Sequence, residues 1–532
     1  MKLKKVFIGG LALSMALSAM ACGGGNSGQS ASGADTSVQR GDSDTDTAQN
    51  AAAGETPDSF ERAEIDMEEE PYTVAIQIVT LPGTDFAGEE DREAAINEIT
   101  LPAINCKVDL QEIWISEIAN TTSMAVAGNE KIDLVHVATV SPLSSMVGSD
   151  ILLDMNEDNL LQTHGQDLIA LMGDVLEAGS VNGKQLAIPA RVFNATVKGF
   201  DYNKTVADEY GIEIPETGAT MDDLENALYA IKEKDPDIMP FYVGSGELNY
   251  LYWLQGYEYF GNEASYGVVM DSSKDLTVEN LFASDEFKDY CLRMYKWKQD
   301  GIQPGDPTDT NTAQSYFGAG QLFVGGAMDM TEAGNAQISA KYDFEVGYAQ
   351  MHEPKITNTT VTEYMWGIAS NCERPDKAMD FLNFVYTNAD VANIIKYGLE
   401  GVNYEFAEGS DKVIITNGTY LTDFVAIGNS EDMLIQSPSG EDSIEKTIAM
   451  EEEATISPIC NYMFDDTQFQ TESSLIYSTI MEYLPRLQNG LCDSEDATLA
   501  LIDEFNQKLE LAGINDVIAA NQEQMDAFLA AQ

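Results

Sequence analysis

The hydrophobic and polar positions after residue 70 follow two periods, one typical of strands and one typical of helices. Apolar residues dominate short runs that we expect to be strands: 72–80 (YTVAIQIVT), 106–114 (CKVDLQEIW) and 132–138 (IDLVHVA). Helical spacing separates these runs at 89–100 and 116–131. Because strands and helices alternate over short intervals, the pattern predicts parallel βαβ units and an α/β fold.

The same rhythm returns after residue 190, which predicts a second α/β unit. A helix is expected to begin at the N-cap Thr220, with Asp223 placed three residues later to complete the cap. A strand at 238–245 follows, and then a helix at 284–300 that Gly301 stops. The 532-residue chain is long enough for two lobes with separate hydrophobic cores.

The N-terminus has a basic head, an uncharged apolar run and a small-residue end, which is typical of a secretory signal peptide over 1–21. The segment AMAC, followed by glycines, resembles a lipobox, although Ala19 stands where that pattern prefers leucine. We therefore expect Cys22 to carry a lipid, and ordinary secretion after a nearby cut is the alternative. Residues 22–70 lack apolar clusters and are rich in Gly, Ser, Asp, Thr and Glu, which predicts a disordered acidic tether.

The net charge of −61 narrows the choice of partners. Nucleic acid is not expected to bind so acidic a chain, and contact with a membrane is expected only through the lipid. An uncharged or basic ligand suits this charge better. The six cysteines include no C-x-x-C pair, and the three histidines form no metal-ligand motif, so neither a cofactor nor a metal is predicted.

Several longer stretches occur in an ordered series: 125–143, 181–190 (VNGKQLAIPA), 215–233 (PETGATMDDLENALYAIKE) and 364–388. Together they resemble the extracellular solute-binding proteins of ABC importers, in particular the carbohydrate-binding branch, although Met221 stands where that family usually has tryptophan. The end of the chain, with CNYMFD at 460–465 and YLPRLQNG at 483–490, resembles the C-terminal domain of a large lipoprotein branch of this family. The resemblance implies a two-lobed periplasmic-binding-protein-like fold, with crossing segments between the lobes and a ligand cleft between them.

On this basis we expect a definite organisation of the chain. A signal peptide at 1–21 is followed by the lipidated cysteine and tether at 22–70. The first lobe is made mainly of 71–190 and 320–365, and the second mainly of 191–319 and 366–450. A C-terminal helical segment at 451–532 packs on the lobes.

A neutral sugar is bound by aromatic rings that stack on its apolar faces and by polar groups that replace the hydrogen bonds its hydroxyls lose. Ligands of α/β sheets bind outside the carboxyl ends of strands, so we expect site residues there. Ser141 follows the strand at 132–138, where capping of a helix is the alternative role. Tyr250 and Trp253 belong to the aromatic stretch at 247–261, where core packing is the alternative.

Further candidates follow from other strand exits and from the resemblance. Asp329 comes after an apolar strand with a Gly pair and is expected to accept sugar hydroxyls, with a helix N-cap as the alternative. Tyr364 and Trp366 share one face of a predicted strand where the family often places an aromatic platform. Trp114 and Trp297 are expected to be structural.

Arg191 and Asn194 lie at the first expected crossing segment. Arg191 is one of few cations in an acidic chain, so a ligand contact is expected, with an internal ion pair as the alternative.

The overall prediction is a monomeric binding protein, lipid-anchored on the extracellular face of the cell membrane. It captures an oligosaccharide and delivers it to the permease subunits of an ABC transporter; a peptide or another small solute is the alternative ligand. A secreted glycoside hydrolase is the enzymatic alternative, because that chemistry needs only two carboxylates about 5–10 Å apart. The signal, the tether and the resemblance favour binding without catalysis.

Overall fold

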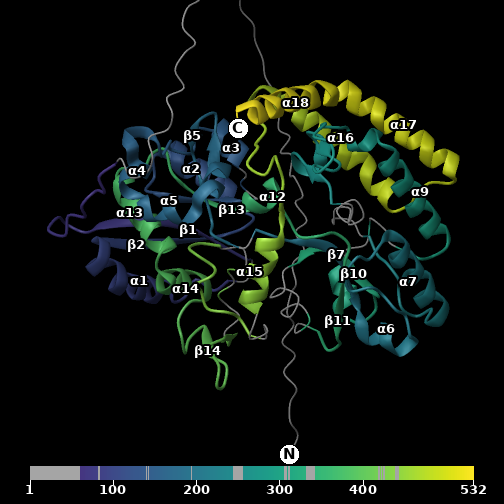
Figure 1. Cartoon of the computed structure of the whole chain (residues 1–532), viewed down its shortest axis with the longest axis horizontal. Coiled ribbons are helices and arrows are strands. Elements are labelled where there is room, and N and C mark those ends of the chain that lie inside the picture. The colour runs from purple at the N-terminus through teal and green to yellow at the C-terminus, as the bar shows by residue number, and fades with distance from the viewer. Residues whose placement is uncertain are drawn as a thin grey trace, which may run out of the picture.

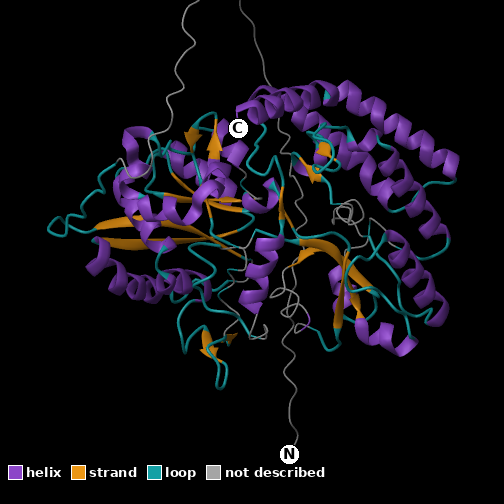
Figure 2. Ribbon diagram, viewed as in Figure 1, coloured by secondary structure: helices purple, strands orange, loops and turns teal. Residues whose placement is uncertain are grey.

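The computed structural model describes residues 60–81, 84–138, 141, 143–192, 194–243, 256–304, 308, 312–330, 339, 342–416, 420, 422, 426–437 and 443–531. Its elements form two lobes, on the left and right of Figure 1, with helix α15 (Ser443–Glu453) between them. Figure 2 shows that each lobe contains a sheet with helices packed around it. The predicted two-lobed α/β architecture is therefore confirmed.

The first lobe is built on a five-stranded sheet in the order β2-β1-β3-β13-β6. These strands are β1 (Tyr72–Thr80), β2 (Cys106–Trp114), β3 (Leu134–Ala138), β6 (Ile188–Pro189) and β13 (Tyr364–Ile368). Strand β1 pairs in parallel with β2 and β3, whereas β13 runs antiparallel to β3. Residues from Val74 to Thr80 are all buried, as expected for a parallel strand that is covered on both faces.

Helices cover both faces of this sheet and form the core of the first lobe with it. They are α1 (Glu89–Ile104), α2 (Ile118–Gly128), α3 (Leu143–Gly148), α4 (Leu160–His164), α5 (Gln166–Met172), α13 (Pro375–Tyr386) and α14 (Ala389–Tyr397). Two short hairpins also belong to this lobe: β4 (Ser180–Val181) with β5 (Lys184–Gln185), and β14 (Tyr404–Phe406) with β15 (Val413–Ile415).

The second lobe is built on a three-stranded antiparallel sheet in the order β10-β7-β11. Its strands are β7 (Val197–Asn203), β10 (Val324–Met330) and β11 (Val346–Gln350), and a separate hairpin pairs β8 (Glu258–Tyr259) with β9 (Val268–Val269). Helices α6 (Lys204–Tyr210), α7 (Met221–Lys234), α9 (Asp285–Gln299) and α10 (Ala313–Gly318) surround the sheet.

The lobes are joined by three crossing segments: the link from β6 to β7, the link from β11 to β13, and the stretch that contains α15. The first two exchange backbone hydrogen bonds between Thr196 and Lys355, at 3.1 and 3.3 Å. The second and third pair through β12 (Lys355–Ile356) and β16 (Thr455–Ile456), which run in parallel. Helix α12 (Asn358–Val361) lies on the second segment. These bonds tie the three crossing segments into one hinge.

The C-terminal helices α16 (Gln470–Gln488), α17 (Glu495–Ala512) and α18 (Ile514–Ala531) pack on the second lobe. Figure 1 shows them in yellow above α9. Their buried residues, among them Ile480 and Phe505, share one core with Phe287 and Trp297 of α9. The helical C-terminal segment predicted from the sequence is therefore a layer of the second lobe.

Individual helices agree with the sequence patterns that predicted them. Thr220 and Asp223 form a complete capping box at the start of α7. Ser284 caps α9, whose buried face carries Phe287 and Trp297, as expected for an amphipathic helix.

Two expectations about the lobes are wrong. Residues 320–365 were assigned to the first lobe, but β10 and β11 flank β7 in the second. Residues 366–450 were assigned to the second lobe, but α13 and α14 pack in the core of the first. The sheet of the second lobe is antiparallel rather than parallel. The strand expected at 238–245 is not formed over its described residues, 238–243, which contribute only the bridge from Met239 to Leu322. Apolar periodicity identifies a strand but not the sheet that it joins, which explains these errors.

Candidate functional site

The edge of the first lobe that faces the second contains the carboxyl ends of β1, β2 and β3. Ala138 ends β3 and pairs with Tyr364, the first residue of β13. Ligands of sheets of this kind bind outside the carboxyl ends of parallel strands. This edge is therefore the place to look for a ligand site.

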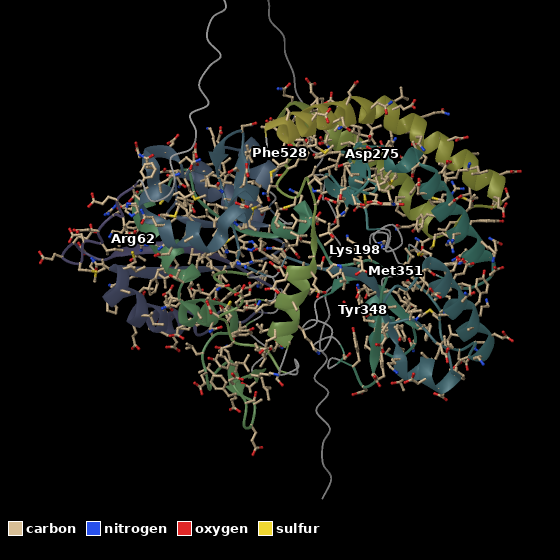
Figure 3. All side chains as sticks on the ribbon, in the orientation of Figure 1. Arg62, Lys198, Asp275, Tyr348, Met351 and Phe528 are labelled. Carbon is tan, nitrogen blue, oxygen red and sulfur yellow. The ribbon has the colours of Figure 1, made fainter. Side chains whose placement is uncertain are left out.

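The opposing edge belongs to the second lobe. Lys198 lies at the start of β7 and is paired in register with Asp329, near the end of β10. Figure 3 shows Lys198, Tyr348 and Met351 near the middle of the molecule, on the side of the second lobe that faces the first. The structure therefore brings the two edges together across the hinge.

A cavity of about 220 Å³ lies between the lobes, and we call it the interlobe cavity. The first lobe contributes Ala138 and Ser145, and the second contributes residues 259–262 and Tyr266. Further walls come from α12 and from the C-terminal segment, whose lining residues are Tyr462, Met463, Phe464 and Asp466. Because its walls come from both lobes, a molecule bound there contacts both at once.

The interlobe cavity combines aromatic rings with acceptor oxygens. The hydroxyl of Tyr266 donates to Asp466 Oδ2 at 2.5 Å, and its ring meets Phe464 edge-on at 5.3 Å between centroids. Burial, and secondly the Asp466 carboxylate, raises the pKa of Tyr266 above its ordinary value, so this hydroxyl stays protonated and donates. Behind the cavity wall, burial alone raises the pKa of Glu263 to about 7.

A second cavity, of about 300 Å³, is larger but is lined by the second lobe and the hinge alone. We call it the hinge cavity. Lys198, His352 and Lys355 are among its lining residues. Lys355 pairs with the buried Glu258 at 2.6 Å, and Ser457 donates to the other oxygen of that carboxylate at 2.7 Å. This network joins β8 to two crossing segments, so we assign it to hinge structure and prefer the interlobe cavity as the ligand site.

An exposed aromatic pair lies farther along the edge of the first lobe. Trp114 ends β2 and is 38% exposed, and its ring stacks on that of Phe86, with 6.1 Å between centroids. Strand β2 is two strands from β3, or roughly 10 Å along the edge. Trp114 is therefore not enclosed in a hydrophobic core, and a contact between its ring and a ligand is a proposal.

Of the predicted site residues, Ser141 and Tyr364 lie at this edge. Ser141 is buried between Ala138 and Leu143, both of which line the interlobe cavity. Its hydroxyl has no hydrogen-bond partner among the described residues. Tyr364 is half-buried, and its ring lies 6.4 Å from that of His136.

Trp366 does not fit the predicted role of a stacking platform. Its side chain is 0% exposed in the core of the first lobe. The indole nitrogen donates to the carbonyl of Ala426 at 2.8 Å, and the ring meets His136 edge-on. Both faces of the ring are covered, so we correct its assignment to a core residue.

The structure places Arg191 and Asn194 in contacts within the hinge, and their predicted contact with a ligand stays a prediction. Arg191 pairs with Glu431 at 3.1 Å and with Glu451 of α15 at 3.3 Å, which is the alternative role expected from the sequence. Asn194 is buried, and its backbone N–H donates to Glu451 Oε2 at 2.7 Å. Both residues thus bind the first crossing segment to the third.

The remaining predicted residues lie beyond what the structure describes. Tyr250, Trp253 and Cys22 fall outside the described residues, and for Asp329 only the backbone register is described. Tyr259 belongs to the same aromatic stretch as Trp253 and lines the interlobe cavity. Sequence patterns gave no sign of Tyr266 and Asp466, because the two residues are far apart in the chain and meet only through the C-terminal helices.

Metal-binding clusters and membrane-spanning helices are both absent from the described part of the chain. Within it, no cluster of three or more His, Cys, Asp or Glu side chains is arranged to bind a metal ion. Nor does any described helix combine the length and apolar character needed to cross a bilayer.

Comparisons with known proteins agree with this architecture. Residues 126–392, half of the chain, match the bacterial extracellular solute-binding protein family, and residues 458–530 match a domain of unknown function, DUF3502. The chain is 27% identical over 452 residues to a carbohydrate ABC transporter substrate-binding protein of Streptococcus pneumoniae serotype 4, covering 82% of this chain and 87% of the relative.

Solved structures show the same fold. An N-glycan transport solute-binding protein (NgtS) of Streptococcus pneumoniae is 23% identical, with a TM-score of 0.73 and coverage of 86% of this chain and 99% of that one. Its complex with Man5GlcNAc has a TM-score of 0.65, with 23% identity and coverage of 87% and 99%. An HMO-binding, ABC-transporter-associated solute-binding protein of Bifidobacterium longum infantis is 16% identical with a TM-score of 0.61, covering 87% and 100%. The chain therefore belongs to the bacterial extracellular solute-binding protein family, whose members bind solutes and are not enzymes.

Proposed function

We propose that this protein captures an oligosaccharide outside the cell, between its two lobes, and delivers it to the permease of an ABC transporter. The interlobe cavity is the observation that carries the proposal, because both lobes line it and its aromatic rings, from the second lobe and the C-terminal segment, lie beside polar side chains. The relatives with carbohydrate and N-glycan names support the same class of ligand.

The chemistry of this edge suits a neutral sugar. Tyr259 and Tyr266 line the cavity with aromatic rings, and Asn262 and Asp466 line it with an amide and a carboxylate that can bind hydroxyls. The cavity is smaller than the roughly 300–1,000 Å³ of pockets that enclose drug-sized ligands. A part of the oligosaccharide therefore occupies it while the rest extends outside.

The Trp114–Phe86 pair supplies the second contact for such an extended ligand. It lies on the same sheet edge as Ala138, which lines the interlobe cavity. A further sugar ring stacking there would add to the bonds made in the cavity. A micromolar dissociation constant corresponds to about −8 kcal/mol, which a few stacked rings and several hydrogen bonds can provide.

Binding is coupled to closure of the lobes. A ligand that contacts both lobes favours the arrangement in which both are close to it, so it shifts the population toward that arrangement. The hinge formed by the three crossing segments is the place where this motion would occur. The permease would then distinguish loaded from empty protein by the arrangement of the lobes.

We further propose that Cys22 carries a lipid and that residues 22–70 tether the lobes to the outer face of the cell membrane, with the protein acting as a monomer. The sequence before the cysteine and the acidic, apolar-poor composition after it support this proposal. Mass spectrometry of the mature N-terminus tests it: a diacylglycerol-modified cysteine is expected, and an unmodified N-terminus elsewhere would contradict it.

Calorimetric titration of the purified mature protein with neutral oligosaccharides and with peptides tests the ligand class. We expect saturable binding of at least one oligosaccharide and none of the peptides. Binding of peptides alone would replace the sugar by the alternative ligand of the same fold. Release of shorter sugars during the titration would instead support the glycoside hydrolase alternative.

A further inference from the structure

The C-terminal domain, which matches a family of unknown function over 458–530, lines the interlobe cavity. Its helices pack on the second lobe at a distance in sequence from every strand of the two sheets. The segment that precedes them passes the opening between the lobes and contributes Tyr462, Phe464 and Asp466 to the cavity wall. This placement gives the domain a position from which it can act on a ligand.

Asp466 is an unusual residue to find in such a wall. The residue is only 6% exposed, yet it lines the cavity. Among the described residues, the hydroxyl of Tyr266 is the one partner of its carboxylate oxygens. A carboxylate accepts up to about four hydrogen bonds, so most of the accepting capacity of Asp466 is unused among the described residues. A buried carboxylate with a single neutral partner is costly to the fold, which points to a role in binding.

Helix α18 holds this carboxylate in place through amide side chains. Asn521 accepts from the hydroxyl of Tyr462 at 2.6 Å and donates to the carbonyl of Tyr266 at 2.8 Å. Gln524 accepts from the N–H of Asp465 at 2.9 Å and donates to its carbonyl at 3.0 Å. Asp465, which precedes Asp466, and Tyr266, its hydrogen-bond partner, are thus both fixed to one helix, and a fixed acceptor loses little entropy when a ligand binds.

The same segment also contacts the first lobe. Asn182 donates to Asp465 Oδ2 at 3.1 Å, and Asn461 donates to the carbonyl of Asp174 at 3.3 Å. Met463 packs against an apolar cluster of that lobe. The C-terminal segment therefore spans the cavity from one lobe to the other.

We propose that the C-terminal domain completes the ligand site and that Asp466 determines specificity by accepting hydrogen bonds from adjacent hydroxyls of the bound sugar. The inference rests on the proposed function and assigns a role to a domain that has none. Tyr266 is a positioning residue: its hydroxyl orients the carboxylate from the second lobe. The site would reject ligands without hydroxyls at this point, because the carboxylate would then lose its water without gaining a donor.

The test compares four proteins: the wild type, Asp466→Asn, Tyr266→Phe and Glu482→Gln. Asparagine keeps the shape of the side chain and can still accept from Tyr266, but it removes the charge. Glu482 lies on the exposed face of α16, so its substitution is a matched control for loss of one charge in the same domain. Each is titrated calorimetrically with Man5GlcNAc, Man1GlcNAc, maltopentaose and xylopentaose, and its melting temperature is measured without ligand.

We expect Asp466→Asn to weaken the best glycan by roughly 10- to 100-fold, the loss typical of a hydrogen bond to a charged group. Tyr266→Phe should weaken it less, and Glu482→Gln should bind as the wild type does. The preference among the four glycans should also change in Asp466→Asn, which a merely structural role would not produce.

Other outcomes overturn the inference in distinguishable ways. If the wild type binds a glycan and both Asp466→Asn and Tyr266→Phe bind it equally well, the role of the domain is wrong while the proposed function stands. If Asp466→Asn weakens all glycans equally and lowers the melting temperature, the residue is structural. If the wild type binds none of the glycans, the proposed function and this inference fail together.

Discussion

Replacement of Glu263 by glutamine is expected to stabilise the protein at neutral pH but not at acidic pH. Glu263 lies in the turn Asn262–Ala264, beside the interlobe cavity. Its side chain is 9% exposed, and Oε2 has no hydrogen-bond partner among the described residues. Burial therefore raises the pKa of this carboxyl to about 7, from an ordinary value of 4.5.

The sign and size of the effect follow from proton binding. When the pH rises, the unfolded chain releases this proton near 4.5, whereas the folded protein keeps it until about 7. Between these values the unfolded state binds fewer protons, so the free energy of unfolding falls as the pH rises. Each pH unit between 4.5 and 7 lowers the free energy of unfolding by about 1.4 kcal/mol, so the total loss reaches about 3 kcal/mol. Glutamine does not titrate, so the free energy of unfolding of the variant does not include this loss.

The assay is urea unfolding of the wild type and Glu263→Gln, followed by tryptophan fluorescence at about pH 4.5 and about pH 8. The gain from the substitution should be about 3 kcal/mol larger at the higher pH. The difference between the stability gains at the two pH values cancels any effect of the glutamine side chain that does not depend on pH. An equal gain at both values, or a larger gain at the lower one, would refute the assignment of a raised pKa to this residue.

Further substitutions test other parts of the structure. Trp114→Ala should weaken glycan binding by roughly 2- to 10-fold in calorimetry, because a stacking ring is lost; unchanged affinity would remove the aromatic pair from the site. Trp366→Phe should lower the free energy of unfolding in urea by about 1–3 kcal/mol, since a buried hydrogen bond and packed volume are lost; weaker glycan binding without destabilisation would restore its predicted role as a platform. Thr220→Ala should lower that free energy by about 1 kcal/mol through loss of the α7 cap, and an unchanged urea midpoint would show that the cap contributes nothing.

Local features of the fold were predictable because they depend on neighbouring residues. The strands of the first lobe and the helices α7 and α9 follow from apolar periodicity and from caps such as Thr220. The later strands β10 and β11 were assigned to the wrong lobe because they pair with β7, which lies more than a hundred residues earlier in the chain. No local pattern specifies that pairing.

The candidate site was predictable only in part, for a related reason. Ser141 follows the predicted strand at 132–138 and Tyr364 begins another, and because strand ends are visible in the sequence, their place at the interlobe edge could be expected. Trp366 was misassigned because a strand residue two positions from Tyr364 gives no sign of which layers cover it. Asp466 was missed because its position depends on α18, a helix about 50 residues later in the chain that packs in the core of the second lobe.

The central claim, that an oligosaccharide binds between the lobes, is tested most directly by a crystal structure of the protein with the glycan that binds it most tightly. We expect one end of the glycan in the interlobe cavity, within hydrogen-bond distance of Asp466. A further sugar ring should lie along the edge toward Trp114. A glycan bound elsewhere, or in contact with one lobe alone, would contradict binding between the lobes.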